Sequence, residues 1–271
     1  MTGVTDAGTE ADLSDDSLAD AALHEAAANR WLTLEGLSNL RDVGGLPLKG
    51  GGTTRTGVLF RSEALNHMTP ADIRHMVDVV GLKLVLDLRT DREVAEFAST
   101  AVAEAGVEIA QFSFIPEEGR ELPEIGEDSD PMVANYLGYL RDRGPNVLGA
   151  VRRLAAEDAG PALVHCAAGK DRTGTLVAMV LDAVGVEREA IIEDYALSAT
   201  RIEDMFTRWR ARTGEPVPDA DELDRHRPRA RAMEEVLAVL DERDGGAAGW
   251  LRANGLTGNE LATLRARFTG A

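Results

Sequence analysis

The single cysteine of the chain, Cys166, lies in the segment VHCAAGKDRTG, which spans residues 164–174. An apolar stretch ends just before it, a loop with a glycine follows, and a helix is expected to begin near Thr173. In such a turn, backbone N–H groups converge on an anion and the helix dipole adds partial positive charge. The same field favours the thiolate form of a cysteine. The segment therefore predicts a thiolate nucleophile in a phosphate-binding loop.

Arg172 follows Cys166 by six positions, so a tight loop can bring the two residues face to face. A guanidinium can hold two phosphoryl oxygens in a planar fork, which a lysine cannot do. We expect Thr173 to donate a hydrogen bond to the sulfur and His165 to support the loop from behind. The other loop residues are expected to bind substrate: Ala167, Ala168, Gly169 and Lys170.

The competing interpretation of a lone cysteine is a buried structural residue, which is its usual fate in a globular protein. The pattern around Cys166 argues against it, because a histidine precedes the cysteine and glycines stand at 169 and 174. Its position between an apolar strand and a helix is a second, independent indication.

Strands are expected at residues 57–61, 83–88, 107–114 and 161–165, and the near-continuous apolar run at 83–88 is typical of a buried strand. Amphipathic stretches at residues 70–80, 91–100, 132–141, 146–157, 173–184 and 187–200 predict helices. Strands that alternate with helices predict an α/β fold on a mostly parallel sheet. We expect a disordered acidic tail over residues 1–24 and one domain over 25–271, with a polar, proline-rich connection at 213–230.

The segment HCAAGKDRTG resembles the signature loop of the cysteine-based tyrosine phosphatase superfamily. Three upstream segments, NLRDVGG (39–45), LFRSE (59–63) and DLRTDRE (87–93), resemble motifs of one bacterial branch. That branch is the atypical tyrosine/serine and phosphoinositide phosphatases of the PtpB type. The resemblance covers about residues 31–268. It implies a four- or five-stranded, mostly parallel sheet flanked by helices, with a two-helix lid within about residues 199–245.

The resemblance implies hydrolysis of phosphotyrosine, and of phosphoserine or phosphothreonine, through a cysteinyl-phosphate intermediate. Lys170 extends this expectation to phosphoinositides, because lipid phosphatases of the tensin-like and myotubularin types carry a cation inside their signature loops. A phosphoinositide headgroup carries more negative charge than phosphotyrosine. The alternative is that Lys170 is an exposed charge outside the pocket.

The general acid has two candidates, because the WPD sequence of most relatives does not occur here. Asp87 ends the strand at 83–88, at the sheet edge where α/β sites lie. Asp171 lies inside the loop, where the guanidinium of Arg172 favours its ionised form and disfavours an acid role. Asp87 is therefore preferred as the acid. Arg61 is expected to bind substrate phosphate, with an ion pair to Asp42 as the alternative.

The chain has 271 residues, 29 basic and 47 acidic, and a net charge of −18. Its acids gather in the first 24 residues and in the loop at 116–130, so they say little about the loop around Cys166. Such acidity argues against nucleic-acid binding. The first residues lack a basic segment followed by an apolar core, so we expect a cytoplasmic protein, with export by a route that needs no signal peptide as the alternative. The expected partners are phosphoproteins or phosphoinositides, the latter through transient contact with a membrane surface, and no metal or cofactor is required.

Two other functions remain open at this stage. A rhodanese-like sulfurtransferase also uses a loop cysteine before a helix, but its loop normally lacks an arginine six residues on followed by Thr-Gly. A non-catalytic phospho-binding module usually lacks the cysteine or the arginine, and both are present here. Release of phosphate, and its loss in C166S, would separate these functions from a phosphatase.

Overall fold

The computed structural model describes residues 30–119, 121–214, 216 and 219–270. The expected acidic tail lies outside these residues. Within them, five strands form one sheet in the order β1-β2-β5-β3-β4. β1 pairs antiparallel with β2 and the other neighbours pair parallel, so the predicted mostly parallel sheet is confirmed. The strands are β1 (Arg41–Asp42), β2 (Leu59–Ser62), β3 (Leu84–Asp87), β4 (Glu108–Gln111) and β5 (Ala162–His165).

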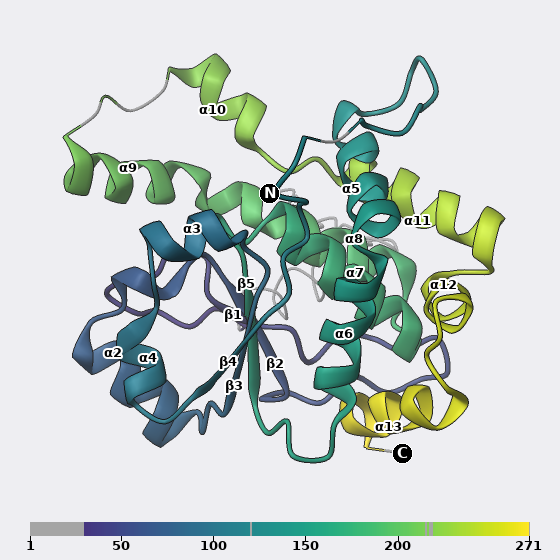
Figure 1. Ribbon diagram of the computed structural model, residues 1–271, viewed down its shortest axis with the longest axis horizontal. Helices are drawn as coiled ribbons and strands as arrows, with labels where there is room; N and C mark the ends of the chain where they lie inside the picture. The colour runs from purple at the N-terminus through teal and green to yellow at the C-terminus, as the bar shows by residue number, and fades with distance from the viewer. Residues whose placement is uncertain (1–29, 120, 215, 217–218, 271) are drawn as a thin grey trace, which may run out of the picture.

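Helices cover both faces of the sheet, as Figure 1 shows with the sheet seen nearly on edge. On one side lie α2 (Pro70–Arg74) with the π-helical turn η2 (His75–Val79), α3 (Asp91–Glu96) and α4 (Thr100–Glu104). On the other side lie α5 (Pro131–Asp142), α6 (Gly144–Ala155), α7 (Asp171–Val184), α8 (Arg188–Ala196), α11 (Ala230–Asp244), α12 (Ala247–Ala253) and α13 (Gly258–Thr269). Short 3-10 turns, η1 (Leu65–His67) and η3 (Leu197–Arg201), follow β2 and α8.

Each central strand divides its apolar side chains between two cores, because successive side chains point to opposite faces of a sheet. In β3, Leu84 and Leu86 join the large core beneath α5, α6 and α7. Val85 joins the smaller core on the α2 and α4 side. A strand buried on both faces has no polar alternation, which is why these strands appear as continuous apolar runs in the sequence.

Two helices lie over the carboxyl ends of the strands, α9 (Ile202–Thr213) and α10 (Ala220–His226). We call α9 and α10 the lid helices. Within the polar, proline-rich segment 213–230, Asp219 caps α10 by accepting a hydrogen bond from the Glu222 N–H at 2.8 Å. The next helix, α11, buries Met233, Val236 and Leu237 in the large core and is no part of the lid.

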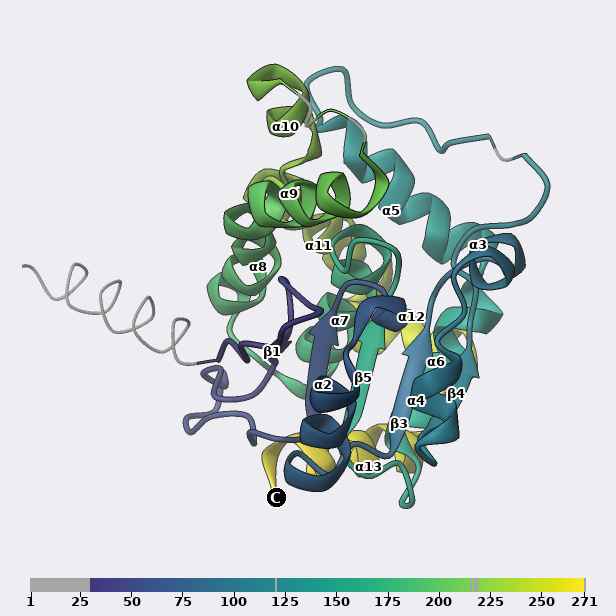
Figure 2. The ribbon, with the colours of Figure 1, turned by 90° about the vertical axis from the view of Figure 1, so that its left-hand side faces the viewer.

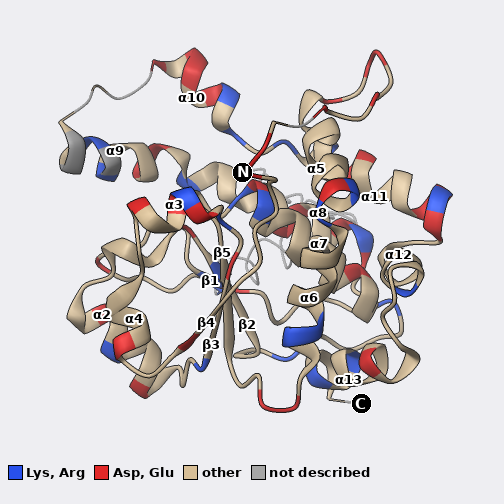
Figure 3. Ribbon diagram, viewed as in Figure 1, with Lys and Arg blue, Asp and Glu red and all other residues tan. Residues whose placement is uncertain are grey.

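Acidic and basic side chains are interspersed over the helices, and acidic residues mark the loop between β4 and α5 (Figure 3). Among the described residues, no helix combines the length and the apolar character needed to cross a membrane.

Candidate active site

Cys166 follows the last residue of β5, and α7 begins at Asp171. We call residues 166–172 the catalytic loop. His165 at the end of β5 is in register with Ser62 of β2 and with Asp87 of β3. The three central strands therefore end together, and the catalytic loop leaves the sheet at its carboxyl edge, as expected for an α/β site.

Gly169 allows the catalytic loop to pass close to the end of β2. Its φ is +69°, and a Cβ there would lie 2.2 Å from the backbone oxygen of Ser62. Gly174 has a similar role in α7, because a Cβ would lie 2.7 Å from the ring of Tyr195. Any other residue at position 169 would force the backbone to move. The two glycines therefore allow the catalytic loop to pack closely against the end of β2 and α7 to pack closely against Tyr195.

Cys166 is buried, with 2% of its surface exposed. The Arg172 side chain is nearly as buried and interacts electrostatically with the cysteine. Burial lowers the pKa of Arg172, but hydrogen bonds to Glu93 and the charges of Cys166 and Glu93 outweigh it and raise the pKa above its ordinary value. The arginine is therefore a permanent cation beside the sulfur.

Glu93, on α3, forms a bidentate ion pair with Arg172. Its two carboxylate oxygens lie 2.6 and 2.7 Å from Nη1 and Nη2. Burial raises the pKa of Glu93, but the hydrogen bond and the charge of Arg172 lower it by more, so its pKa lies below the usual value. This partner was missed in the sequence, although Glu93 ends the DLRTDRE segment. The sequence did contain one indication that Glu93 has a structural role. It lies three residues after Thr90, which is the spacing of a helical capping box.

Asp87 is not arranged as a general acid, which corrects the preference derived from the sequence. The Arg89 guanidinium donates to both carboxylate oxygens at 2.6–3.1 Å, and only 2% of Asp87 is exposed. Burial raises the pKa of Asp87, but the Arg89 hydrogen bond and the nearby His165 hold it below the usual value. Arg89 occupies both carboxylate oxygens, so neither is free to approach a leaving group.

Asp171 lies at the first position of α7, with 23% of its side chain exposed. Its Oδ1 accepts a 2.7 Å hydrogen bond from the Tyr136 hydroxyl, and its Oδ2 lies 3.3 Å from Nζ of Lys170. The neighbouring Arg172 turns instead to Glu93. Asp171 therefore contacts Tyr136 and Lys170 rather than the guanidinium of Arg172.

Arg61 is fully buried and its guanidinium is occupied by protein partners, which does not support the prediction that it binds phosphate. Its Nη1 donates to Asp194 at 2.7 Å and its Nη2 to the carbonyl of Gly169 at 3.0 Å. Its acidic partner is therefore Asp194 rather than the expected Asp42. Strand alternation places the Arg61 side chain on the α7 and α8 side of the sheet, beneath the catalytic loop.

The remaining predicted residues surround the cysteine. Lys170 lines the pocket and donates from Nζ to the carbonyl of His226, at the end of α10, at 2.7 Å. Ala167 and Ala168 also line the pocket. His165 contacts the Cys166 carbonyl through Nδ1 at 3.0 Å, in line with the expected support of the loop. Thr173 is fully buried, and among the described residues its hydroxyl has no hydrogen-bond partner, so the expected bond to the sulfur of Cys166 is not formed.

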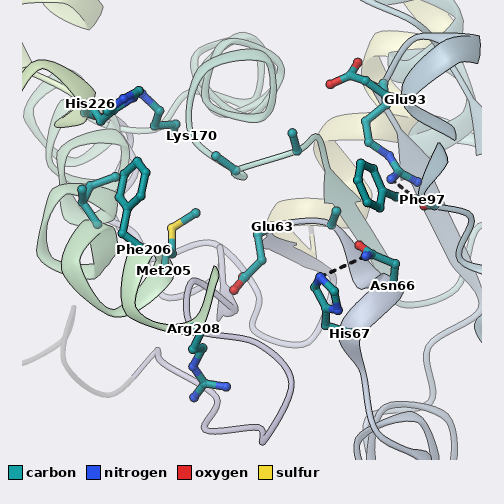
Figure 4. A pocket seen from close by; sticks show the side chains of 15 residues that line it. Glu63, Asn66, His67, Glu93, Phe97, Lys170, Met205, Phe206, Arg208 and His226 are labelled. Atoms are coloured by element: carbon teal, nitrogen blue, oxygen red, sulfur yellow. Dashed lines mark hydrogen bonds between the residues drawn. The ribbon is translucent and has the colours of Figure 1, made fainter. Parts of the chain in front are cut away.

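A pocket of about 440 Å³ opens in front of the catalytic loop. Figure 4 shows Met205 and Phe206 of α9 on one side of it, with Glu93 and Phe97 on the other. Its remaining lining residues are Glu63, Ala64, Asn66, His67, Arg89, Ile202, Arg208, His226 and the loop residues Ala167, Ala168 and Lys170. The walls are mostly apolar and the cations stand at the loop and the lid, an arrangement that suits an aromatic or cyclic group bearing an anion. Over the described residues, no three His, Cys, Asp or Glu side chains are grouped to hold a metal ion.

Comparison with known proteins identifies the family that the chain resembles. The model of the tyrosine phosphatase family matches residues 32–270. A tyrosine-protein phosphatase of Nostoc commune is 31% identical over 215 residues, which cover 77% of this chain and 73% of that protein. The triple specificity protein phosphatase PtpB of Mycobacterium tuberculosis is 29% identical over 282 residues, covering 88% of this chain and 98% of that protein.

Two solved structures are also similar. The catalytic domain of the PP-IP phosphatase SIW14 from S. cerevisiae is 14% identical, with a TM-score of 0.37, over 78% of this chain and 95% of that one. TpbA of P. aeruginosa is 25% identical, with a TM-score of 0.32, over 62% of this chain and 84% of that one.

Proposed function

The chain belongs to the tyrosine phosphatase family, and on that premise we propose that it hydrolyses phosphotyrosine, phosphoserine or phosphothreonine, and phosphoinositide monoesters through a cysteinyl-phosphate intermediate. The observation that carries the proposal is the placement of Cys166 and Arg172 in one loop, of which Ala167, Ala168 and Lys170 line the pocket. The family match and the intact Cys-x5-Arg pattern disfavour a sulfurtransferase and a non-catalytic binding module.

In the first step, the Cys166 thiolate attacks phosphorus, so a P–S bond forms while the ester P–O bond breaks. Arg172 and the N–H groups of the catalytic loop bind the phosphoryl oxygens and stabilise the charge that develops on them. In the second step, water attacks phosphorus, the P–S bond breaks, and inorganic phosphate leaves with Cys166 restored as a thiolate.

Asp171 is the acid and base that we assign to these steps. It protonates the leaving oxygen in the first step and accepts a proton from the attacking water in the second. Its support is its place in the catalytic loop with 23% of its side chain exposed, whereas Asp87 is buried and held by Arg89. Tyr136 fixes the Asp171 carboxylate through the 2.7 Å hydrogen bond.

The walls of the pocket suggest the classes of substrate. Phe97 and Phe206 offer apolar surface to the ring of a phosphotyrosine. Lys170 and Arg208 also line the pocket, where they can meet the further phosphates of an inositol ring. Lys170 must give up its bond to the His226 carbonyl to do so, which couples binding of a polyanion to the end of α10.

The test is a side-by-side assay of p-nitrophenyl phosphate, phosphopeptides and phosphoinositides with the wild type and C166S. We expect the wild type to release phosphate from p-nitrophenyl phosphate, from phosphotyrosine peptides and from some phosphoinositides, and C166S to release none. If the wild type hydrolyses the phosphopeptides but none of the phosphoinositides, the lipid part of the proposal is wrong. Retained activity in C166S would remove the mechanism.

A further inference from the structure

Five consecutive carbonyl groups of the catalytic loop, those of residues 166–170, accept hydrogen bonds. These bonds run from the amide of Asn39 to the carbonyl of Ala168 at 3.2 Å and from Arg61 to that of Gly169 at 3.0 Å. The neighbouring carbonyls also accept hydrogen bonds. The carbonyl oxygen of Cys166 lies 3.0 Å from Nδ1 of His165. The carbonyl of Ala167 accepts from the Ala64 N–H at 3.0 Å, and that of Lys170 from the Gly174 N–H at 2.7 Å.

The direction of these bonds decides where the N–H groups point. In a trans peptide, the C=O of one residue and the N–H of the next point in opposite directions. Because Asn39 and Arg61 hold the carbonyls of Ala168 and Gly169, the N–H groups of Gly169 and Lys170 face the other way. That side is the one on which a bound oxyanion would lie.

Asn39 is itself held in a single orientation. It is fully buried, and its Oδ1 accepts a 2.7 Å hydrogen bond from Nη1 of Arg41. Its backbone N–H donates to a carboxylate oxygen of Glu63 at 2.9 Å. The bond from Arg41 identifies Oδ1 as the acceptor, so Nδ2 must be the atom that faces the loop.

Asp194, on α8, fixes the arginines of this network. Its carboxylate lies 3.2 Å from Nε of Arg41, 2.7 Å from Nη1 of Arg61 and 2.8 Å from Nη1 of Arg30. Burial raises the pKa of Asp194, but the charges of Arg41, Arg61 and Arg30 lower it far below the usual value. Burial and the charge of Arg61 lower the pKa of Arg41 to about 9. The group is therefore a buried, ionised cluster directly beneath the catalytic loop.

We propose that Asn39 and Arg61 are positioning residues for the reaction, which hold the Ala168 and Gly169 carbonyls so that the following N–H groups face the substrate oxyanion. Asp194 aligns Arg61 directly and Asn39 through Arg41. The inference rests on the proposed phosphatase function for its link to catalysis. Its structural content, the orientation of the loop N–H groups, is measurable without turnover.

The experiment compares N39A and N39D with the wild type. N39A removes both the donor to the loop and the acceptor for Arg41, whereas N39D keeps an acceptor and removes the donor. The matched control is N146D, because Nδ2 of Asn146 donates to the carbonyl of Ser113 at 3.0 Å on α6, away from the loop. Binding of tungstate, an oxyanion similar in shape to phosphate, is measured by calorimetry, together with kcat and KM for p-nitrophenyl phosphate and with Tm.

We expect N39A and N39D each to bind tungstate about tenfold more weakly and to lose a similar factor in kcat/KM. N146D should bind tungstate with the affinity of the wild type, even if its Tm falls by as much as that of the Asn39 variants. Agreement between the two Asn39 variants also excludes repulsion by the new carboxylate as the cause, because N39A adds no charge. Wild-type tungstate affinity in N39A, or restored affinity in N39D, would overturn the proposal.

The two proposals fail in different ways. If the wild type released no phosphate, or if C166S kept the activity, the phosphatase mechanism would fall while the tungstate comparison still tested the role of Asn39. If the wild type and C166S behave as expected and the Asn39 variants bind tungstate normally, the mechanism stands and the positioning role falls.

Discussion

Glu93 and Arg172 are joined by two hydrogen bonds, of 2.6 and 2.7 Å, that connect the first turn of α3 to the catalytic loop. A guanidinium has two edges that can each hold a pair of oxygens. Glu93 takes the edge formed by Nη1 and Nη2, so we expect the edge that includes Nε to bind the phosphoryl group. Glu93 would then orient the guanidinium of Arg172 and would not compete with the substrate for it.

The variant E93Q tests this relationship. We expect it to lower kcat/KM for p-nitrophenyl phosphate by roughly 10- to 100-fold, because a small misplacement of a charge-stabilising group costs about that much in rate. The matched control is E260Q. Glu260 also closes a capping box and pairs with an arginine, Arg152, at 2.9 Å, but on α13.

E260Q should keep its kcat/KM while losing a comparable amount of helix stability, measured as Tm. Higher activity in E93Q than in the wild type would mean that Glu93 blocks Arg172, and the positioning role would be wrong.

The assignment of the acid is tested with substrates whose leaving groups differ in basicity. We expect D171N to lose about 100-fold or more in kcat with a phenyl phosphate of poor leaving ability, and far less with an activated one, because a good leaving group needs no proton. D87N should lose activity equally with both substrates, if it loses any. The reverse pattern, with only D87N rescued by the activated substrate, would return the acid role to Asp87.

Asp87 is expected to act on stability instead. Its pKa is lowered in the folded protein, so its stabilising effect is fully present above the unfolded value of about 4 and is lost as the pH falls through the folded value. D87N should therefore melt well below the wild type at pH 7, and the two Tm values should converge below about pH 4.

The control for this pH dependence is D158N. Asp158 pairs with Arg153 at 3.1 Å, but its side chain is 82% exposed, so removing it should change Tm little at any pH. A constant difference in Tm between the wild type and D87N from pH 7 to pH 3 would contradict an ionised, stabilising Asp87.

Phe97 offers a test of the pocket wall. It is 49% exposed and lines the pocket, so F97A should change Tm little. We expect it to lower kcat/KM for a phosphotyrosine peptide by roughly tenfold and to affect a phosphoserine peptide much less, since a lost apolar contact is worth about 1–3 kcal/mol. L122A is the control, because Leu122 is 46% exposed and does not line this pocket. Equal losses on both peptides would show that Phe97 does not contact the ring.

The lipid part of the proposal depends on Lys170. K170M removes the cation and keeps most of the side chain, so we expect the ratio of phosphoinositide to phosphotyrosine activity to fall about tenfold. R225M, which removes a cation from α10 outside the pocket lining, should leave the ratio unchanged. A ratio that K170M does not alter would place Lys170 outside headgroup recognition.

The sequence predicted the sheet and the catalytic loop because both depend on local patterns. Continuous apolar runs mark strands buried on both faces, and the spacing from Cys166 to Arg172 falls within one loop. The partners of the charged residues were not predictable in this way. Arg61 meets Asp194, which is 133 residues away, and Arg172 meets Glu93, which is 79 residues away. Such pairs depend on how helices pack on the sheet, so the partners of Arg61 and Arg172 could be identified only from the structure.

Acid quenching during turnover of p-nitrophenyl phosphate, followed by peptide mass spectrometry, shows whether Cys166 carries the phosphoryl group. We expect phosphate on the peptide that contains Cys166 in the wild type, and more of it in D171N, because loss of the base slows the second step. We expect none in C166S, which should also release no product. Steady turnover by C166S, or phosphate bound to a residue other than Cys166, would show that Cys166 is not the nucleophile.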